Sequence, residues 1–295
     1  MSEARDTRLS VFKTYKLYVG GKFPRSESGR VYEVTDSKGA AWLANAPLSS
    51  RKDARDAVAA ARKAVAGWSG ATAYNRGQVL YRVAEMLEGR REQFAREVAD
   101  AEGLSKSKAA AVVDAAVDRW VWYAGWTDKI ASVVGGANPV AGPYFNLSTP
   151  EPTGVVAVLA PQDSSFLGLV SVLAPVIATG NTAVLVASER APLPALSLGE
   201  VLATSDVPGG VVNILSGRTA EIAAPLAAHR DVNALDLTGA DPSLAAELEA
   251  AAADNLKRVR CPAPAQAPED WTADPGTSRL TSWLETKTVW HPIGV

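Results

Sequence analysis

The sequence predicts an α/β protein with a parallel β-sheet, preceded by helices and followed by a β-prone tail. Three observations lead to this fold class. From Gly154 onwards, short apolar runs alternate with helical patterns, which is typical of strands joined by crossover helices. Long helical patterns precede this region, and a Gly- and Pro-rich stretch separates the two. The last residues are rich in Thr, Val and Trp, which favours a strand.

The N-terminal part is expected to hold a β-hairpin and three helices. Residues 16–34 alternate in polarity and contain Gly turns, which predicts a small β-meander or a hairpin. Ser49 or Ser50 can cap a helix, because apolar residues recur after them at helical spacing. Two longer helices are predicted over residues 74–101 and 107–133. The second carries an aromatic stripe that we interpret as core or interface packing; its members are Trp120, Trp122, Tyr123 and Trp126.

The central part is expected to form the sheet. Helices are predicted near residues 166–178, 194–204 and 219–228, and a fourth begins at Pro242 with Asp241 as its cap. Four of the predicted strands are mostly apolar runs of the length that buried parallel strands have; they cover residues 154–160, 182–187, 211–215 and 232–237. A last short strand is predicted over residues 257–260.

The stretch between this sheet and the tail is dominated by Pro and Ala and has no periodicity, which indicates a linker. The tail is expected to need a partner for its free strand edge. The resulting division is residues 1–137 for the hairpin and helices, 138–153 for a second hairpin, 154–262 for the sheet domain, 263–280 for the linker and 281–295 for the terminal strand.

Composition excludes several classes of function. The formal net charge is -2, so no general attraction to nucleic acid or to an anionic membrane is expected. No signal peptide is recognisable, and the longest apolar run is interrupted by Pro175 and too short to cross a membrane. We therefore expect a cytoplasmic protein. One Cys and two His residues exclude an intrachain disulfide and give no zinc cluster, so no metal is predicted.

Chemistry-bearing residues follow the predicted strands, but no nucleotide-binding motif does. Neither G-x-G-x-x-G nor the phosphate-loop motif is present. Asp163 and Glu189 could serve as acid and base, or they could be helix caps and solvated loop residues. Cys261 follows basic residues that would favour its thiolate, although a lone Cys at a strand end is more often inert. No His is placed to activate Ser164, which argues against a hydrolase.

Several strings in order resemble the aldehyde dehydrogenase superfamily over nearly the whole chain. KLYVGGKF is similar to the family's opening hairpin, and DRWVWYAGWTDKI to its third helical segment. PTGVVAVLAP, VPGGVVNILSG and ALDLTGAD are similar to successive strands of its cofactor domain, and ETKTVWHPIG to its C-terminal oligomerisation strand. The resemblance implies a Rossmann-like fold with N-terminal helices and a small β oligomerisation element.

The chain departs from the family where the chemistry is expected. The resemblance places Asp163 at the Asn that stabilises the oxyanion, and an ionised carboxylate cannot donate a hydrogen bond there. Val186 replaces the family's ribose-binding Lys, whereas Glu189 is kept. Asp241 and Leu244 put charge and bulk into the turn that passes the pyrophosphate. Cys261 stands near the general base, too early for the nucleophile, and roughly 200 residues of catalytic domain are absent after it.

The resemblance therefore implies no catalytic residue, with Asp163 and Cys261 as degenerate positions. NAD(P) is the implied cofactor, with binding expected to be weak or lost; its positions would be Ala160, Pro161, Ser188, Glu189, Gly217 and Gly239. Oligomerisation is expected through Tyr144, Phe145, Leu147, Thr286, Thr288, Val289 and Trp290.

Three functions remain open from the sequence. The leading hypothesis is a non-catalytic subunit in a homo-oligomer, or in a hetero-oligomer with a full-length aldehyde dehydrogenase. The first alternative is an NAD(P)-dependent oxidoreductase that oxidises an aldehyde to an acid. The second is an NAD-binding sensor module without chemistry. The sequence identifies neither the partner nor the aldehyde.

Overall fold

A five-stranded parallel sheet forms the centre of the molecule. The computed structural model describes residues 11–264 and 267–294. The sheet has the order β7-β6-β5-β8-β9, and every neighbouring pair is parallel. The chain winds outward from β5 to β7 and then crosses back to β8, so the topological switch point lies between β5 and β8. This confirms the predicted Rossmann-like sheet; its strands are β5 (Val155–Leu159), β6 (Thr182–Val186), β7 (Val212–Leu215), β8 (Ala234–Asp236) and β9 (Arg258–Arg260).

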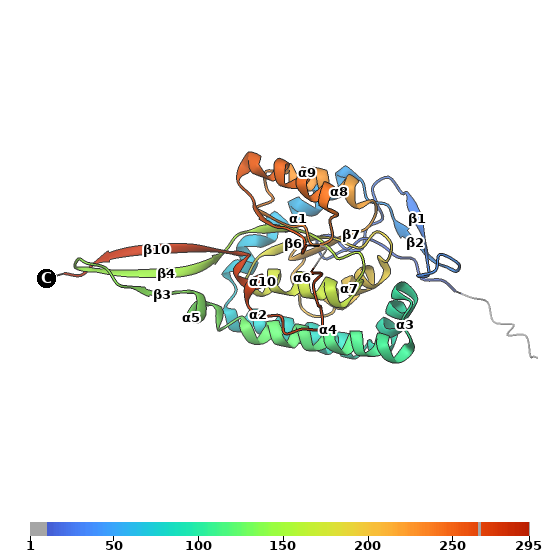
Figure 1. The fold of residues 1–295 in the computed structure, drawn as a ribbon, viewed down its shortest axis with the longest axis horizontal. Coiled ribbons are helices and arrows are strands. Elements are labelled where there is room, and N and C mark those ends of the chain that lie inside the picture. Colours follow the sequence, from blue (N-terminus) through green and yellow to red (C-terminus); the bar gives the residue numbers. More distant parts are fainter. Residues whose placement is uncertain (1–10, 265–266, 295) are drawn as a thin grey trace, which may run out of the picture.

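Helices cover both faces of this sheet (Figure 1). Side chains of β5 alternate between two apolar clusters, with Val156 and Val158 in one and Val155 and Ala157 in the other. Burial on both faces explains why this strand is apolar at every position. One face carries α1 (Arg51–Gly70), α8 (Thr219–Ala227) and α9 (Pro242–Ala252). The other carries α6 (Leu167–Ala178) and α7 (Leu193–Ala203), with α2 (Ala73–Glu88) and α4 (Lys106–Trp126) outside them.

The two long N-terminal helices that the sequence predicts are each interrupted. The first ends at Glu88, and α3 (Arg91–Glu102) follows after Gly89, a residue that weakens a helix interior. The second ends at Trp126, and α5 (Ile130–Val134) follows a turn. The predictions of unbroken helices over 74–101 and 107–133 are therefore wrong in continuity, although the positions are right. The aromatic stripe is packed as predicted, with Trp120 and Tyr123 fully buried.

The N-terminal hairpin differs in position from the prediction. β1 (Val31–Thr35) pairs antiparallel with β2 (Trp42–Pro47), so only the end of the predicted segment lies in this hairpin, and around Gly20 and Gly21 a short bridge joins Val19 and Lys22. The nearby Tyr18 instead bridges Ile214 of β7. The segment predicted as a hairpin therefore extends one edge of the central sheet, because that edge strand has backbone groups to satisfy.

Three strands form an arm that projects from the body (Figure 1). We use "the arm" for β3 (Gly136–Asn138), β4 (Tyr144–Pro152) and β10 (Leu284–Pro292), which form an antiparallel sheet in the order β10-β4-β3. The register runs from the Leu284–Pro152 pair to the Pro292–Tyr144 pair. The predicted C-terminal strand therefore exists and pairs within its own chain, with β4.

The predicted linker is packed against the body in its described part. We use "the strap" for residues 267–283, which include α10 (Ser278–Thr281). Arg279 pairs with Asp236 at 3.0 Å, and both side chains are buried. Trp283 is fully buried, and its carbonyl oxygen accepts a 2.8 Å hydrogen bond from Asn181 Nδ2. The predicted linker is thus a packed segment in its described part, and it leads from β9 to the base of the arm.

Within the described residues, no helix has the length and apolar character that crossing a membrane requires.

Candidate functional site

The six positions implied for a cofactor line one edge of the central sheet. Ala160 and Pro161 follow β5, and Ser188 and Glu189 follow β6. The two glycines follow the strands on either side of this pair, Gly217 after β7 and Gly239 after β8. Because neighbouring parallel strands end at the same edge, the fold brings all six to the place where open α/β sheets bind ligands.

Gln162 joins two of these strand ends. Its Nε2 donates to the carbonyl oxygen of Ala160 at 3.1 Å, and its Oε1 accepts from the amide of Glu189 at 2.9 Å. Ser188 Oγ also donates to the Gln162 carbonyl oxygen at 3.3 Å. Asp163, the next residue, is exposed. The loop after β5 is therefore closed by its own hydrogen bonds, and the carboxylate that follows faces solvent.

Glu189 is engaged by the chain itself. Its carboxylate forms an ion pair with Arg218, and it accepts a 3.0 Å hydrogen bond from the amide of Thr219, the first residue of α8. It thereby caps the helix. Of the two interpretations left open by the sequence, the structure places Glu189 as a helix cap, and Asp163 and Glu189 share no hydrogen bond within the described residues.

Asp241 occupies the N-terminus of α9. Its Oδ1 accepts from the amides of Ser243 and Leu244 at 3.0 and 2.9 Å, which confirms the predicted cap. The free amides and the positive end of a helix dipole are what attract a phosphate to such a turn. Here the chain's own carboxylate already takes two of those amides, and its charge would repel a phosphate.

Gly239 is required by its neighbours on the backbone. A Cβ atom at this position would lie 1.9 Å from the carbonyl oxygen of Ala160 and 2.6 Å from its carbonyl carbon. The Gly239 amide donates to the carbonyl oxygen of Leu159 at 3.0 Å. The close approach of the β8–α9 turn to the end of β5 accounts for this glycine without any ligand.

Almost no space is left between α8, α9 and the sheet. The cavity there measures about 10 Å³. Such a volume is at the limit for a single water molecule, whereas ligand pockets span about 300–1,000 Å³. The lining is wholly apolar and consists of Ala157, Leu159, Ala223, Leu226, Ala227, Leu235, Leu237 and Leu248. The apolar layer between these two helices and the sheet is therefore closely packed.

Cys261 lies two strands away from β5, just after the edge strand β9, and is exposed. Its Sγ donates to Glu249 Oε1 at 2.9 Å, and this carboxylate raises the pKa of the thiol. The basic neighbours that the sequence offered as activators are bound elsewhere: Arg258 pairs with Glu285, and Arg260 donates to Ser282 Oγ. Of the two interpretations that the sequence left open for Cys261, the raised pKa of the thiol favours the inert one.

We expect Glu249→Gln to make Cys261 more reactive. Removing the acceptor carboxylate removes the main cause of the raised pKa, so more thiolate is present at pH 7–8. The measurement is the rate of iodoacetamide alkylation against pH, followed by mass spectrometry. The alkylation curve of Glu249→Gln should lie at lower pH than that of the native chain, and Glu247→Gln on the same helix is the control. Coincident curves for all three proteins would contradict the assigned contact.

Sequence reasoning did not predict the contacts of three residues that shape this edge. Nothing in the sequence marks Gln162 as a clamp or pairs Glu249 with Cys261, because these contacts arise from the packing of loops and helices. Arg218 had a weak signal, since it follows a predicted strand beside Ser216 and Gly217. Among residues 11–264 and 267–294, no group of three or more His, Cys, Asp or Glu side chains could hold a metal ion.

Known proteins match this chain over most of its length. A family described as "Aldehyde dehydrogenase family" matches residues 23–268. An aldehyde dehydrogenase of Davidiella tassiana is 30% identical over 91% of this chain and 54% of its own length. Retinal dehydrogenase 2 of Gallus gallus is 33% identical over 84% of this chain and 48% of its own length.

A solved structure gives the same picture of the fold. The NAD+ complex of aldehyde dehydrogenase from Bacillus cereus superposes with a TM-score of 0.79 at 28% identity, covering 84% of this chain and 50% of that one. The chain thus spans about half the length of the curated relatives and of the solved structure that it matches.

Proposed function

This chain belongs to the aldehyde dehydrogenase family, and from that premise we propose that it acts as a non-catalytic subunit that associates with a full-length aldehyde dehydrogenase. The proposal rests on the contacts made at the edge where the strands of the central sheet end, which we call the strand-end edge. Each carboxylate or thiol that could serve the family's chemistry there is either bound by a neighbour in the chain or turned to solvent.

Nucleophilic thiol chemistry needs an activated Cys, an oxyanion donor and a base. Cys261 donates to a carboxylate that raises its pKa. Asp163 stands where a hydrogen-bond donor is required, and an ionised carboxylate has none to give. Glu189 is held by Arg218 and Thr219. These assignments support a chain that contributes no turnover of its own and binds NAD(P) weakly or not at all.

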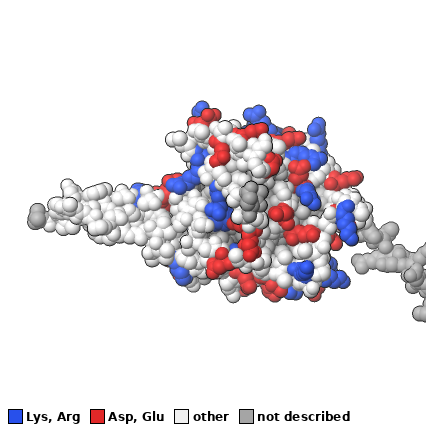
Figure 2. Space-filling model, viewed as in Figure 1, with Lys and Arg blue, Asp and Glu red and all other residues white. Residues whose placement is uncertain are grey.

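The arm supports association with a partner. Its outer part, residues 135–150 and 288–294, contains no Lys, Arg, Asp or Glu, and it is uncharged in Figure 2 while the body is densely charged. Phe145 and Trp290 are 47% and 57% exposed. Within the described residues, β10 pairs only with β4, which leaves its outer edge open. An uncharged sheet with exposed aromatic residues and an open edge is suited to docking by strand addition.

The packing of the strap supports the interpretation that this chain is adapted to a short connection between β9 and β10. It passes from β9 to β10 over α4 and α6 and buries Leu280 and Trp283 on the way. Arg119 of α4 donates to the carbonyl oxygens of Trp271 and Ala273 at 2.7 and 3.1 Å. The strap therefore covers core residues and satisfies buried polar groups, as a native element does.

We expect a tagged chain to recover a full-length aldehyde dehydrogenase from its own cell in a fixed ratio. The measurement is affinity capture followed by native mass spectrometry. Phe145→Ser/Trp290→Ser should reduce the recovered partner at least tenfold, roughly the effect of losing one interface anchor. The matched control is Trp42→Ser/Tyr74→Ser, which removes two exposed aromatic residues from the body. A native chain that stays a monomer in the presence of its relatives would overturn the proposal.

Two assays separate the alternatives. Aldehyde-dependent NADH production by the isolated chain, abolished by Cys261→Ala, would establish the oxidoreductase instead. Saturable NAD binding in calorimetry at about 1 mM or below, without turnover, would establish the sensor. For the proposed subunit we expect neither signal.

A further inference from the structure

A second concave region lies between α1 and α8, outside the strand-end edge. It is a groove of about 780 Å³, which falls within the range of small-molecule sites. The α1 side comes from the first residues of the helix, and the α8 side from its last turn and the loop after it. We use "the α1–α8 groove" for its lining residues, which are Glu27, Ser50, Arg51, Lys52, Ala54, Arg55, Pro225, Leu226, Ala228, His229 and Arg230.

The charge of this groove is positive. Four cationic side chains line it, against the single carboxylate of Glu27. Glu27 and Lys52 form an ion pair at 3.3 Å. Arg51 and Arg230 are exposed, and within the described part of the chain their guanidinium groups form neither an ion pair nor a hydrogen bond. The groove thus holds two arginines whose charge is available to a ligand.

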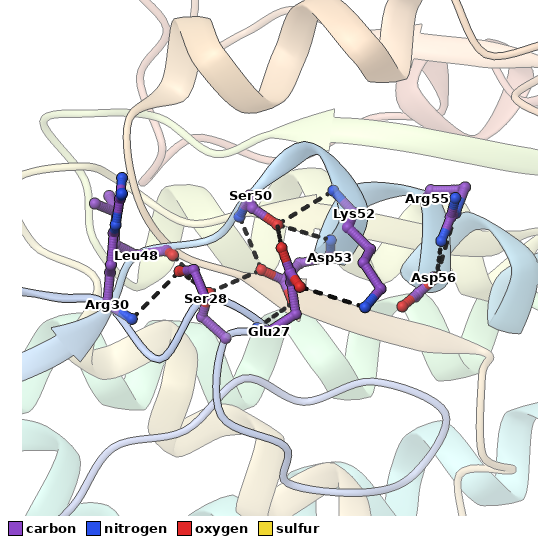
Figure 3. A network of polar contacts seen from close by, with 10 residues as sticks. Glu27, Ser28, Arg30, Leu48, Ser50, Lys52, Asp53, Arg55 and Asp56 are labelled. Atoms are coloured by element: carbon purple, nitrogen blue, oxygen red, sulfur yellow. Dashed lines mark hydrogen bonds and ion pairs between the residues drawn. The ribbon is translucent and has the colours of Figure 1, made fainter.

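The carboxylates near these arginines are occupied. Asp53 is buried and points into the turn before α1, where it accepts from Ser26 Oγ at 2.9 Å, the Glu27 amide at 3.0 Å and the Ser50 amide at 2.8 Å (Figure 3). Asp56 pairs with Arg55 at 3.4 Å. Asp231, which follows Arg230, lies 3.9 Å from Arg62 Nε. Glu27, Asp53, Asp56 and Asp231 therefore each have a partner other than Arg51 and Arg230.

The rest of the lining adds one donor and an apolar floor. His229 Nδ1 accepts from the amide of Asp231 at 3.1 Å, so the neutral ring carries its proton on Nε2 and can donate there. The floor consists of Ala54, Pro225 and Leu226. An anion with an attached apolar group would match both parts, since guanidinium groups bind phosphate in a bidentate manner.

We propose that the α1–α8 groove binds a small phosphate monoester, with its phosphate on Arg51 and Arg230 and its organic part on Pro225 and Leu226. The site is distinct from the strand-end edge and from the arm. Its existence therefore does not depend on the chain being a non-catalytic subunit.

Calorimetry on the full chain at low salt tests the proposal with phenyl phosphate and inorganic phosphate as probes. We expect saturable binding of phenyl phosphate with a dissociation constant of about 1 mM or lower. Arg51→Gln/Arg230→Gln should weaken it at least tenfold. The charge-matched control is Arg96→Gln/Lys106→Gln, which removes two exposed cations elsewhere. Melting temperatures of both variants show that the fold is kept.

The outcomes decide between the parts of the proposal. Tighter binding of phenyl phosphate than of inorganic phosphate, lost only in Arg51→Gln/Arg230→Gln, supports the whole assignment. Equal affinity of the two probes would overturn the role of the apolar floor. Equal binding to both double variants, or no binding to the native chain, would overturn the site.

Discussion

Replacing Arg279 by Ala is expected to lower the free energy of unfolding by about 3–5 kcal/mol, the cost of breaking a buried ion pair. The Arg279 side chain is 4% exposed and that of Asp236 is fully buried, with 3.0 Å between Nη1 and Oδ2. The guanidinium also pairs with Glu269 and lies 5.3 Å from the centre of the Trp271 ring. Its loss would leave Asp236 with an uncompensated buried charge and would release the strap.

Urea denaturation followed by circular dichroism measures this change. Arg258→Ala is the matched control, because Arg258 and Glu285 form an exposed pair, with 41% and 50% of their side-chain surface accessible. Exposed pairs contribute about 1 kcal/mol or less. Arg279→Met/Asp236→Leu should recover much of the loss, since apolar replacement of both partners is often neutral. Similar losses for Arg279→Ala and Arg258→Ala would show that the buried pair does not hold the strap.

Gly239→Ala is expected to destabilise the protein by at least about 3 kcal/mol, beyond the usual cost of overpacking. The added methyl group would meet two backbone atoms of Ala160, at 1.9 and 2.6 Å. Backbone atoms cannot rotate away as a side chain can, so the β8–α9 turn or the end of β5 must move. The change would also separate the two strand ends between which the topological switch point lies.

Gly67→Ala supplies a control of opposite sign. Gly67 lies inside α1, and a Cβ there meets no atom within 4 Å. Alanine should therefore stabilise the helix by about 0.5–1 kcal/mol. Urea denaturation of both variants compares them directly. If Gly239→Ala unfolded at the same urea concentration as the native chain, the close packing of this turn would be refuted.

The central sheet was predictable because its signal is local. Most of its strands are short apolar runs, and a helix start can be recognised where a cap precedes Pro, as with Asp241 and Pro242. Helix interruptions were not predictable from the same patterns. Gly89 is compatible with either a weak helix position or a break, and the choice depends on how α2 and α3 pack against α4.

The candidate site could be located from the sequence but not described by it. The predicted strand ends place Glu189, Gly217 and Gly239 on one edge of the central sheet, and the structure shows them there. The partners of those residues come from other elements, as with Arg218 for Glu189. Cys261 illustrates the limit most clearly: its basic neighbours in sequence are turned to Glu285 and Ser282, while the acid that controls its pKa stands twelve residues earlier.

The sequence by itself determined the family resemblance, the order of strands and helices in the central sheet, and the positions at which the family's chemistry is replaced. These properties depend on residue identity and short-range periodicity. Only the tertiary structure decided that the Pro- and Ala-rich strap is fixed by Arg279 and Trp283, that β10 pairs with β4, and that Glu189 is held by its neighbours. The reason is physical: burial, ion pairing and strand register join residues far apart in the chain, and composition within a segment carries no information about its distant partner.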